Sequence, residues 1–322
     1  MMLLLTLGLA PLALGGALAA FTRYTAGKVE AALPPAGRMV AVPGGHIHVQ
    51  EQGAGPAILL IHGLGGQACH YTYRLAGLLA EQYRVVTVDR PGSGYSERDA
   101  AHPAGLEAQA DALAALIDTL QLGQAVVVGH SLGGAVALAL AQRHPDKVKA
   151  LALLAPLTQL PEEVPPAFRA LTIKSRAMQQ LLAWTLVTPA TIARSRQVLE
   201  QVFAPEAVPR DYAVRGGGIL SLRPSQFLAA CADMQAVPDV MPGVIAGYPA
   251  MQVPVSVLYG RQDRILDWKA NGQGLLAQLP GSTLELVDGG HMLPVTQPEL
   301  CARFIMQAAQ NAWTEEALLN ET

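Results

Sequence analysis

Short, almost wholly apolar runs recur along this chain and alternate with segments of helical spacing. The runs "AILLI", "VVTV", "AVVV" and "ALALL" contain no charged side chain and are rich in β-branched residues or leucine. Strands that are apolar on both sides are buried on both faces, which is typical of a parallel sheet covered by helices. The alternation therefore predicts an α/β fold with a mostly parallel central sheet flanked by helices.

One long segment interrupts this alternation. Residues 39–156 contain a predicted hairpin and then alternating strands and helices, the expected first part of the core. Residues 157–248 show no strand pattern and carry proline-punctuated helical segments, so we expect a helical insert there. Strands and helices return over residues 249–322, the expected second part of the core. Apolar residues of the insert that recur at helical spacing are expected to be core residues; they are Leu171, Met178, Leu181, Leu182 and Trp184.

The N-terminal segment differs from the rest of the chain. Residues 1–22 have no charged side chain, and their number is about that needed for an apolar helix to cross a bilayer. We expect a membrane anchor with a single N-terminal span, then a linker over residues 23–38. Arg23, Lys28 and Arg38 favour a cytoplasmic catalytic domain. The alternatives are a cleaved signal peptide with a small-residue site at residues 17–19, giving an exported or periplasmic protein, and a helix buried in the globular domain.

Charge, cysteine and histidine content argue against several classes of function. The net charge is −3 and 15% of residues are charged, so no basic face for nucleic acid is expected. The three cysteines, Cys69, Cys231 and Cys301, fit neither a disulfide framework nor a zinc site. His46 and His48 share a face of a predicted strand but have no further candidate ligand nearby. No metal and no cofactor are therefore expected.

The stretch "VVVGHSLGGAVALAL" changes from strand to helix character at a serine. Ser131 stands on this corner between Gly129 and Gly133, in a G-x-S-x-G pattern. In such a corner the serine takes a strained conformation, and side chains at the two glycine positions would collide. The helix N-terminus beneath the serine favours developing negative charge. This context predicts that Ser131 is a nucleophile.

A serine hydroxyl needs a base to take its proton, and the base needs a carboxylate to orient it. Downstream, Asp263 follows the strand pattern "VPVSVLYG" and His291 follows "STLELVDG". Both lie just past the carboxyl end of a predicted strand, the edge where ligands bind in open α/β sheets. Asp263 and His291 are therefore the predicted partners of Ser131, and Asp267 is the alternative carboxylate.

Acyl transfer also needs hydrogen-bond donors for the oxyanion. One is expected to be the backbone N–H of Leu132, the residue after the nucleophile. The other is expected in the glycine-rich loop after the first buried strand, where we choose the N–H of Leu64. This loop also fits G-x-G-x-x-A, which with Asp89 after the next strand could indicate a dinucleotide site. A dinucleotide site would give the serine, the aspartate and the histidine no function, so their placement would be accidental.

The motifs "HGLGG", "DRPGSGYS", "GHSLGG", "GRQDR" and "GGHMLP" follow the order found in the α/β-hydrolase superfamily, which this chain resembles from Met39 to its C-terminal helix. The resemblance implies a triad of Ser131, Asp263 and His291, and a cap domain where the helical insert lies. Relatives that hydrolyse epoxides or haloalkanes carry aspartate at the nucleophile position. The serine found here argues against both of those chemistries.

Together these features predict a serine hydrolase that cleaves carboxylic esters with an apolar acyl part, acting on a small-molecule ester or a lipid. The membrane is a second expected partner, through the N-terminal segment, and the sequence indicates no oligomeric state. Carbon–carbon bond hydrolysis and thioester or amide cleavage remain alternatives on the same fold. An alternative from another class is a membrane-tethered binding protein without activity.

Overall fold

The computed structural model describes residues 2–161 and 163–320 and contains one central sheet. Its strands lie in the order β1-β2-β4-β3-β6-β7-β8-β9, and β5 pairs with β2. From β4 to β9 along this order every pair is parallel, whereas β1, β2 and β5 join antiparallel. The strands are β1 (Arg38–Val42), β2 (Gly45–Gln52), β3 (Ala57–Ile61), β4 (Arg84–Val88), β5 (Glu97–Arg98), β6 (Ala125–His130), β7 (Val148–Leu154), β8 (Val255–Gly260) and β9 (Thr283–Val287). The predicted, mostly parallel sheet is confirmed.

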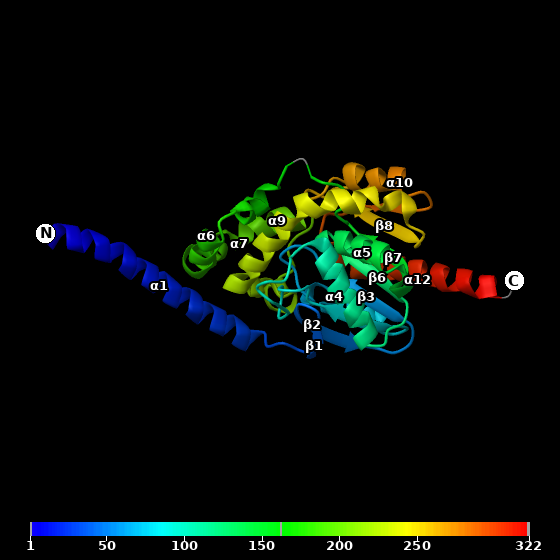
Figure 1. The fold of residues 1–322 in the computed structure, drawn as a ribbon, viewed down its shortest axis with the longest axis horizontal. Helices are drawn as coiled ribbons and strands as arrows, with labels where there is room; N and C mark the ends of the chain where they lie inside the picture. The colour runs from blue at the N-terminus through cyan, green and yellow to red at the C-terminus, as the bar shows by residue number, and fades with distance from the viewer. Residues whose placement is uncertain (1, 162, 321–322) are drawn as a thin grey trace.

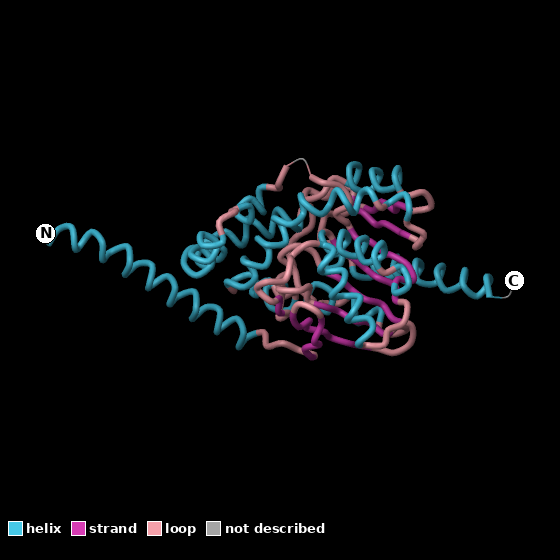
Figure 2. The backbone as a smooth tube through the Cα atoms, in the orientation of Figure 1, coloured by secondary structure: helices cyan, strands magenta, loops and turns pink. Residues whose placement is uncertain are grey.

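Helices flank the sheet on both faces, as Figures 1 and 2 show. Helices α4 and α5 contribute to the core on one face, and α3 and α12 to the core on the other. The α-helices are α1 (Met2–Ala32), α2 (Cys69–Thr72), α3 (Leu75–Leu79), α4 (Leu106–Thr119), α5 (Leu132–Arg143), α6 (Arg176–Leu182), α7 (Thr188–Phe203), α8 (Tyr212–Arg215), α9 (Pro224–Ala246), α10 (Gly274–Gln278), α11 (Leu293–Thr296) and α12 (Pro298–Asn320). Shorter helical turns are η1 (Pro145–Lys147), η2 (Pro166–Thr172), η3 (Ala183–Val187), η4 (Gly218–Leu222), η5 (Tyr248–Ala250) and η6 (Lys269–Gln273).

The two faces of strand β3 explain why its sequence is apolar throughout. Leu59 and Ile61 join the core beneath α4 and α5, whereas Ile58 and Leu60 join the core beneath α3 and α12. Successive side chains of a strand point to opposite faces, so a strand covered on both sides needs apolar residues at every position. In β6, Val127 likewise joins the core beneath α4 and α5, whereas its two neighbours along the strand join the core beneath α3 and α12. The continuous apolar runs are therefore a direct consequence of the layered fold.

The helical segments between β7 and β8 form an insert. Over this interval the described residues contain no strand, and helices α6, α7 and α9 lie together at one end of the sheet (Figure 1). The two ends of the insert meet, because the Tyr248 hydroxyl donates a hydrogen bond to the Thr158 carbonyl at 2.7 Å. The chain therefore leaves the core and returns to it at one place.

Apolar residues of the insert are less buried than their spacing predicts. Met178, Leu181 and Trp184 are 46%, 58% and 41% exposed. Helix α6 continues directly into η3, a turn with π-helical hydrogen bonding, so the helical period changes within this segment. On this stretch Gln179 and Ala183 are buried instead. The expectation that these apolar residues all belong to the core is wrong for the three exposed ones.

Helix α1 requires a correction at the N-terminus. Within the described part of the chain, no helix is long and apolar enough to cross a membrane, so the predicted membrane-spanning anchor is wrong. From Pro11 onward the helix carries Arg23, Lys28 and Glu30, and these charges limit its apolar length. All three charges follow residue 22, so they lie outside the uncharged stretch from which the anchor is predicted.

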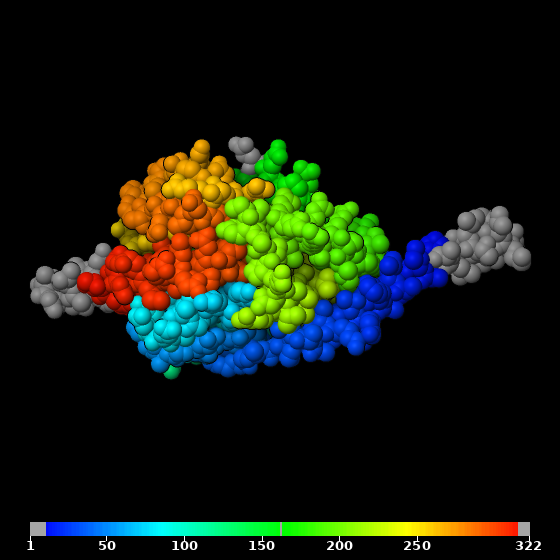
Figure 3. Space-filling view, turned by 180° about the vertical axis from the view of Figure 1, so that it is seen from behind, coloured from blue at the N-terminus to red at the C-terminus, as the bar shows by residue number. Residues whose placement is uncertain are grey.

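Helix α1 also packs against the insert, with which it lies side by side in Figures 1 and 3. It contacts η3 and η4, and its Thr22 and Val29 side chains are buried. Near its end, Glu30 lies 3.6 Å from the guanidinium of Arg223, the residue just before α9. One side of the helix is therefore covered by protein, while side chains on its other sides, such as Tyr24, are exposed.

Candidate active site

Ser131 lies at the turn between β6 and α5. Its backbone has φ 54° and ψ −123°, a positive-φ conformation that few residues other than glycine adopt. A Cβ on Gly129 would lie 2.5 Å from the Gly133 carbonyl oxygen, and a Cβ on Gly133 would lie 2.2 Å from the Ile61 carbonyl oxygen. Both clashes involve backbone atoms, so glycine is required at both positions. The turn thus has the strained geometry expected from the G-x-S-x-G pattern.

Asp263 and His291 come together although they follow different strands. The His291 Nδ1 and the Asp263 Oδ2 are 2.7 Å apart, and both side chains are buried. The other carboxylate oxygen, Oδ1, accepts hydrogen bonds from the backbone N–H groups of Ile265 at 2.8 Å and Leu266 at 3.0 Å. These bonds fix the carboxylate, which can in turn fix the tautomer and orientation of the imidazole.

The alternative carboxylate, Asp267, is exposed. Its Oδ1 accepts a hydrogen bond from the backbone N–H of Lys269 at 3.0 Å, so it caps its own turn. The geometry therefore favours Asp263 as the partner of His291.

The His291 loop lies beside the end of β6, next to Ser131. The His130 Nε2–H donates a hydrogen bond to the His291 carbonyl at 2.9 Å, and the two imidazole rings are 4.9 Å apart. Burial and the neighbouring His291 hold the pKa of His130 well below its usual value. His130 is therefore neutral and joins the strand that carries Ser131 to the loop that carries His291.

The glycine-rich loop after β3 approaches the same serine from the other side. A Cβ on Gly63 would lie 2.8 Å from the Ser131 Cβ and 3.3 Å from its Oγ. The loop closes on itself, because the Gly66 N–H donates to the Gly63 carbonyl at 3.2 Å. Leu64, one predicted oxyanion donor, lies in this loop, and Leu132, the other, is the first residue of α5.

His62 supports this loop from within. Its Nε2 accepts the backbone N–H of Arg90 at 2.8 Å, so the proton of the neutral ring is on Nδ1. That Nδ1–H donates to the Gly63 carbonyl at 2.8 Å. Burial and the charge of Arg90 hold the pKa of His62 well below its usual value. Both ring nitrogens are therefore used in structure.

His70 is another buried histidine next to the loop. A Cβ on Gly66 would lie 3.1 Å from the Nδ1 atoms of both His62 and His70. The His70 Nε2 is hydrogen-bonded to the Tyr212 hydroxyl at 3.0 Å, while its Nδ1 has no hydrogen-bond partner in the described part of the chain. Burial lowers the pKa of His70 to about 4. No sequence motif pointed to Tyr212, which comes from α8 of the insert.

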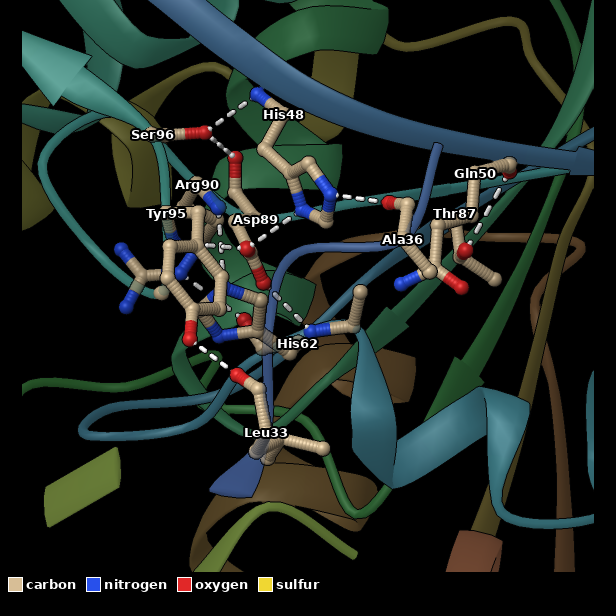
Figure 4. Close-up of polar contacts among 12 residues, drawn as sticks. Leu33, Ala36, His48, Gln50, His62, Thr87, Asp89, Arg90, Tyr95 and Ser96 are labelled. Atoms are coloured by element: carbon tan, nitrogen blue, oxygen red, sulfur yellow. Dashed lines mark hydrogen bonds and ion pairs between the residues drawn. The ribbon is translucent and has the colours of Figure 1, made fainter. Parts of the chain in front are cut away.

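The Asp89 carboxylate is fully engaged within the protein, as Figure 4 shows. It accepts the backbone N–H groups of Ala68 at 2.7 Å and Tyr95 at 2.8 Å, and it lies 2.8 Å from the His48 Nδ1. The other ring nitrogen of His48 is bonded to the Ala36 carbonyl. Asp89 is thus used to order loops and to attach the segment after α1, which argues against the dinucleotide site, and His48 is not placed as a metal ligand.

Comparisons with known proteins identify the family of this chain. A family model described as the alpha/beta hydrolase fold matches residues 56–298. The chain therefore belongs to the α/β-hydrolase family, whose members are hydrolases.

Among relatives, the chain is 33% identical over 246 residues to the pimeloyl-[acyl-carrier protein] methyl ester esterase of Chromobacterium violaceum, covering 74% of this chain and 88% of that protein. It is 38% identical over 123 residues to the 2-hydroxymuconate semialdehyde hydrolase of Pseudomonas sp. (strain CF600), covering 38% of this chain and 44% of that protein. The second match thus spans less than half of the relative's length. Among solved structures, a thermophilic esterase from Thermogutta terrifontis aligns with a TM-score of 0.70 at 24% identity, over 85% of this chain and 99% of that one.

Proposed function

We propose that this chain is a serine hydrolase that cleaves carboxylic esters with an apolar acyl part. The observation that carries the proposal is the buried Asp263–His291 pair, with 2.7 Å between Oδ2 and Nδ1, at the sheet edge where the strained turn holds Ser131. Residues 39–156 and 249–322 form the catalytic core in this proposal, and residues 157–248 act as its cap.

In the proposed reaction, the Ser131 Oγ attacks the ester carbonyl while His291 accepts its proton. Asp263 keeps the imidazole oriented and stabilises its positive form. The N–H groups of Leu64 and Leu132 bind the oxyanion of each tetrahedral intermediate. His291 then protonates the leaving alcohol, and a water molecule activated by His291 releases the acid and restores the serine.

Ester cleavage is the first choice because a relative that aligns over 88% of its length is named as a methyl ester esterase. Carbon–carbon bond hydrolysis of a diketone-like substrate is the second candidate. It is favoured by the similarity to a semialdehyde hydrolase, although that match covers only 44% of the relative.

A fluorophosphonate probe tests the nucleophile, and an ester series of increasing acyl length tests the reaction. We expect the wild-type protein to be labelled and to hydrolyse esters, and Ser131→Ala to lose both by several orders of magnitude. Equal labelling of Ser131→Ala would contradict the nucleophile, and no labelling of folded wild-type protein would favour a non-catalytic binding protein. Labelling together with faster turnover of a diketone-like compound than of any ester would favour the second candidate.

A further inference from the structure

Arg90 is a completely buried arginine whose side chain contacts the glycine-rich loop after β3, residues 62–66. We call this segment the oxyanion loop, because it carries the proposed donor Leu64. It lies two residues after β4 and has 0% exposure. Its Nε donates to the His62 carbonyl at 2.9 Å, and its Nη2 donates to the Gly63 carbonyl at 3.0 Å. The guanidinium therefore holds two consecutive carbonyl groups of the loop with rigid, charge-assisted hydrogen bonds.

The direction of these carbonyls decides where the next N–H points. The Gly63 carbonyl accepts from Arg90, from the His62 Nδ1 at 2.8 Å and from the Gly66 N–H at 3.2 Å. The peptide bond between Gly63 and Leu64 is trans, and in a planar trans peptide the C=O and the N–H point in opposite directions. Fixing the carbonyl toward Arg90 therefore fixes the Leu64 N–H away from it.

The far side of the guanidinium is bound by the insert. Its Nη1 donates to the Asp233 Oδ2 at 2.8 Å, and Asp233 lies on α9 with a fully buried side chain. The same Nη1 donates to the Gln109 Oε1 at 2.8 Å. Asp233 also accepts from Arg98 at 3.1 Å. A buried guanidinium is costly unless it is paired, so Asp233 is what allows Arg90 to remain at this place.

We propose that Arg90 is a positioning residue for the oxyanion loop, and that its ion pair with Asp233 couples the placement of the helical insert to the orientation of the Leu64 N–H. This inference rests on the proposed serine hydrolase function and adds a route by which the insert controls the rate of acyl transfer. An insert seated on the core keeps Arg90 extended toward the loop. An insert that is displaced removes the counter-charge and frees the loop carbonyls.

The test compares kcat and KM for an ester substrate in five variants. Arg90→Met removes the donors to the loop, and we expect kcat to fall about 10²–10³-fold, as for loss of one oxyanion donor, with KM changed much less. Arg90→Lys should restore part of kcat, because one ammonium can replace some but not all of the fork of donors. Asp233→Asn keeps the shape of the carboxylate without its charge and should lower kcat by roughly tenfold.

The matched control is Arg98→Met. Arg98 shares the Asp233 carboxylate and donates to the Pro91 carbonyl at 3.3 Å, but the contacts to the His62 and Gly63 carbonyls come from Arg90. We expect its kcat to stay within about threefold of wild type. A loss of kcat equal to that of Arg90→Met would overturn the proposal. It would show that disturbing the buried charges lowers kcat even when the contacts to the loop carbonyls remain.

The double variant Arg90→Met/Asp233→Leu tests whether the low kcat of Arg90→Met comes from misfolding around the unpaired charge of Asp233. Replacing a buried ion pair by apolar residues of similar size is often neutral or stabilising, so this protein should fold. Its kcat should remain as low as that of Arg90→Met. A wild-type kcat in the double variant, or a loss confined to KM, would overturn the inference.

Fluorophosphonate labelling distinguishes failure of the positioning role of Arg90 from failure of the proposed function. If wild-type protein is labelled at Ser131 and hydrolyses esters while the Arg90 variants keep their kcat, only the positioning role fails. If wild-type protein is neither labelled nor active on esters, the proposed function fails and the positioning role fails with it.

Discussion

A single methyl group at Gly63 offers the sharpest test of the geometry around the nucleophile. The φ of Gly63 lies outside the left-handed region, so alanine can adopt the backbone conformation. Its Cβ, however, would lie 2.8 Å from the Ser131 Cβ and 3.3 Å from the His130 carbonyl oxygen. Ordinary van der Waals contact begins at 3.4 Å. Either the loop or the serine must therefore move by roughly half an ångström, and both belong to the proposed reaction centre.

The expected loss in Gly63→Ala follows from this displacement. Misplacing reacting groups by about 1 Å can lower a rate 10²-fold, and loss of one oxyanion donor lowers kcat about 10²–10³-fold. We expect kcat for an ester substrate to fall roughly 10²-fold, with a smaller change in KM. Overpacking of this kind costs about 1–3 kcal/mol, so the protein stays folded with a lower melting temperature.

Gly65→Ala is the control within the same loop. Gly65 has φ +63°, but no atom lies within 4 Å of its Cβ position. Alanine there costs about 1–2 kcal/mol of backbone strain without approaching Ser131. We expect lower stability and a kcat close to that of wild type. A Gly63→Ala enzyme with wild-type kcat, or equal losses of kcat in the two variants, would refute the reasoning that Gly63 provides space for the nucleophile.

Three further predictions concern stability and reactivity. His70 has a pKa of about 4 in the folded protein and 6.5 as its ordinary value, so below pH 6.5 the unfolded state binds a proton that the folded state excludes, and the free energy of unfolding falls. Urea unfolding should show about 2 kcal/mol lost from this group between pH 7 and pH 5, and His70→Gln should show a shallower fall. Gly77→Ala, at a position with nothing within 4 Å and no positive φ in α3, should stabilise the protein by about 0.4–1 kcal/mol in the same assay, and a loss would contradict the open space. Burial raises the pKa of the Cys231 thiol to about 11, so a thiol reagent at pH 8 should modify Cys231 only after unfolding, as peptide mapping would show.

The core of the fold could be predicted from the sequence because its strands carry an unusually clear signal. A strand such as β3 is apolar at every position, and only a sheet covered on both faces buries every position. The turn at Ser131 was equally predictable, because its glycines face backbone atoms and tolerate no side chain. Asp263 and His291 could be placed at the same edge because the carboxyl ends of parallel strands lie together.

The insert and the N-terminus were less predictable because their environment is set by distant contacts. Leu181 and Trp184 have core-like spacing, yet the passage from α6 into η3 leaves them exposed. The apolar length of the N-terminal segment does not reveal that α1 continues through the charged residues Arg23, Lys28 and Glu30. The pair Arg90–Asp233 spans 143 positions along the chain, and no local pattern marks either residue as a partner of the other.

The polar contacts between insert and core reach both loops that flank Ser131. Four of the polar pairs matter for these loops: His70–Tyr212 at 3.0 Å, Gln67–Gly216 at 3.0 Å, Arg90–Asp233 at 2.8 Å and Gly290–Glu206 at 3.0 Å. The first three hold the oxyanion loop and the residues that support it, and the fourth holds the residue before the proposed base. Displacing an insert attached in this way would disturb the groups that we propose to act in the transition state. Exchange of the insert to alter acyl preference must therefore supply new partners for Arg90 and Gly290, or kcat will fall for every substrate.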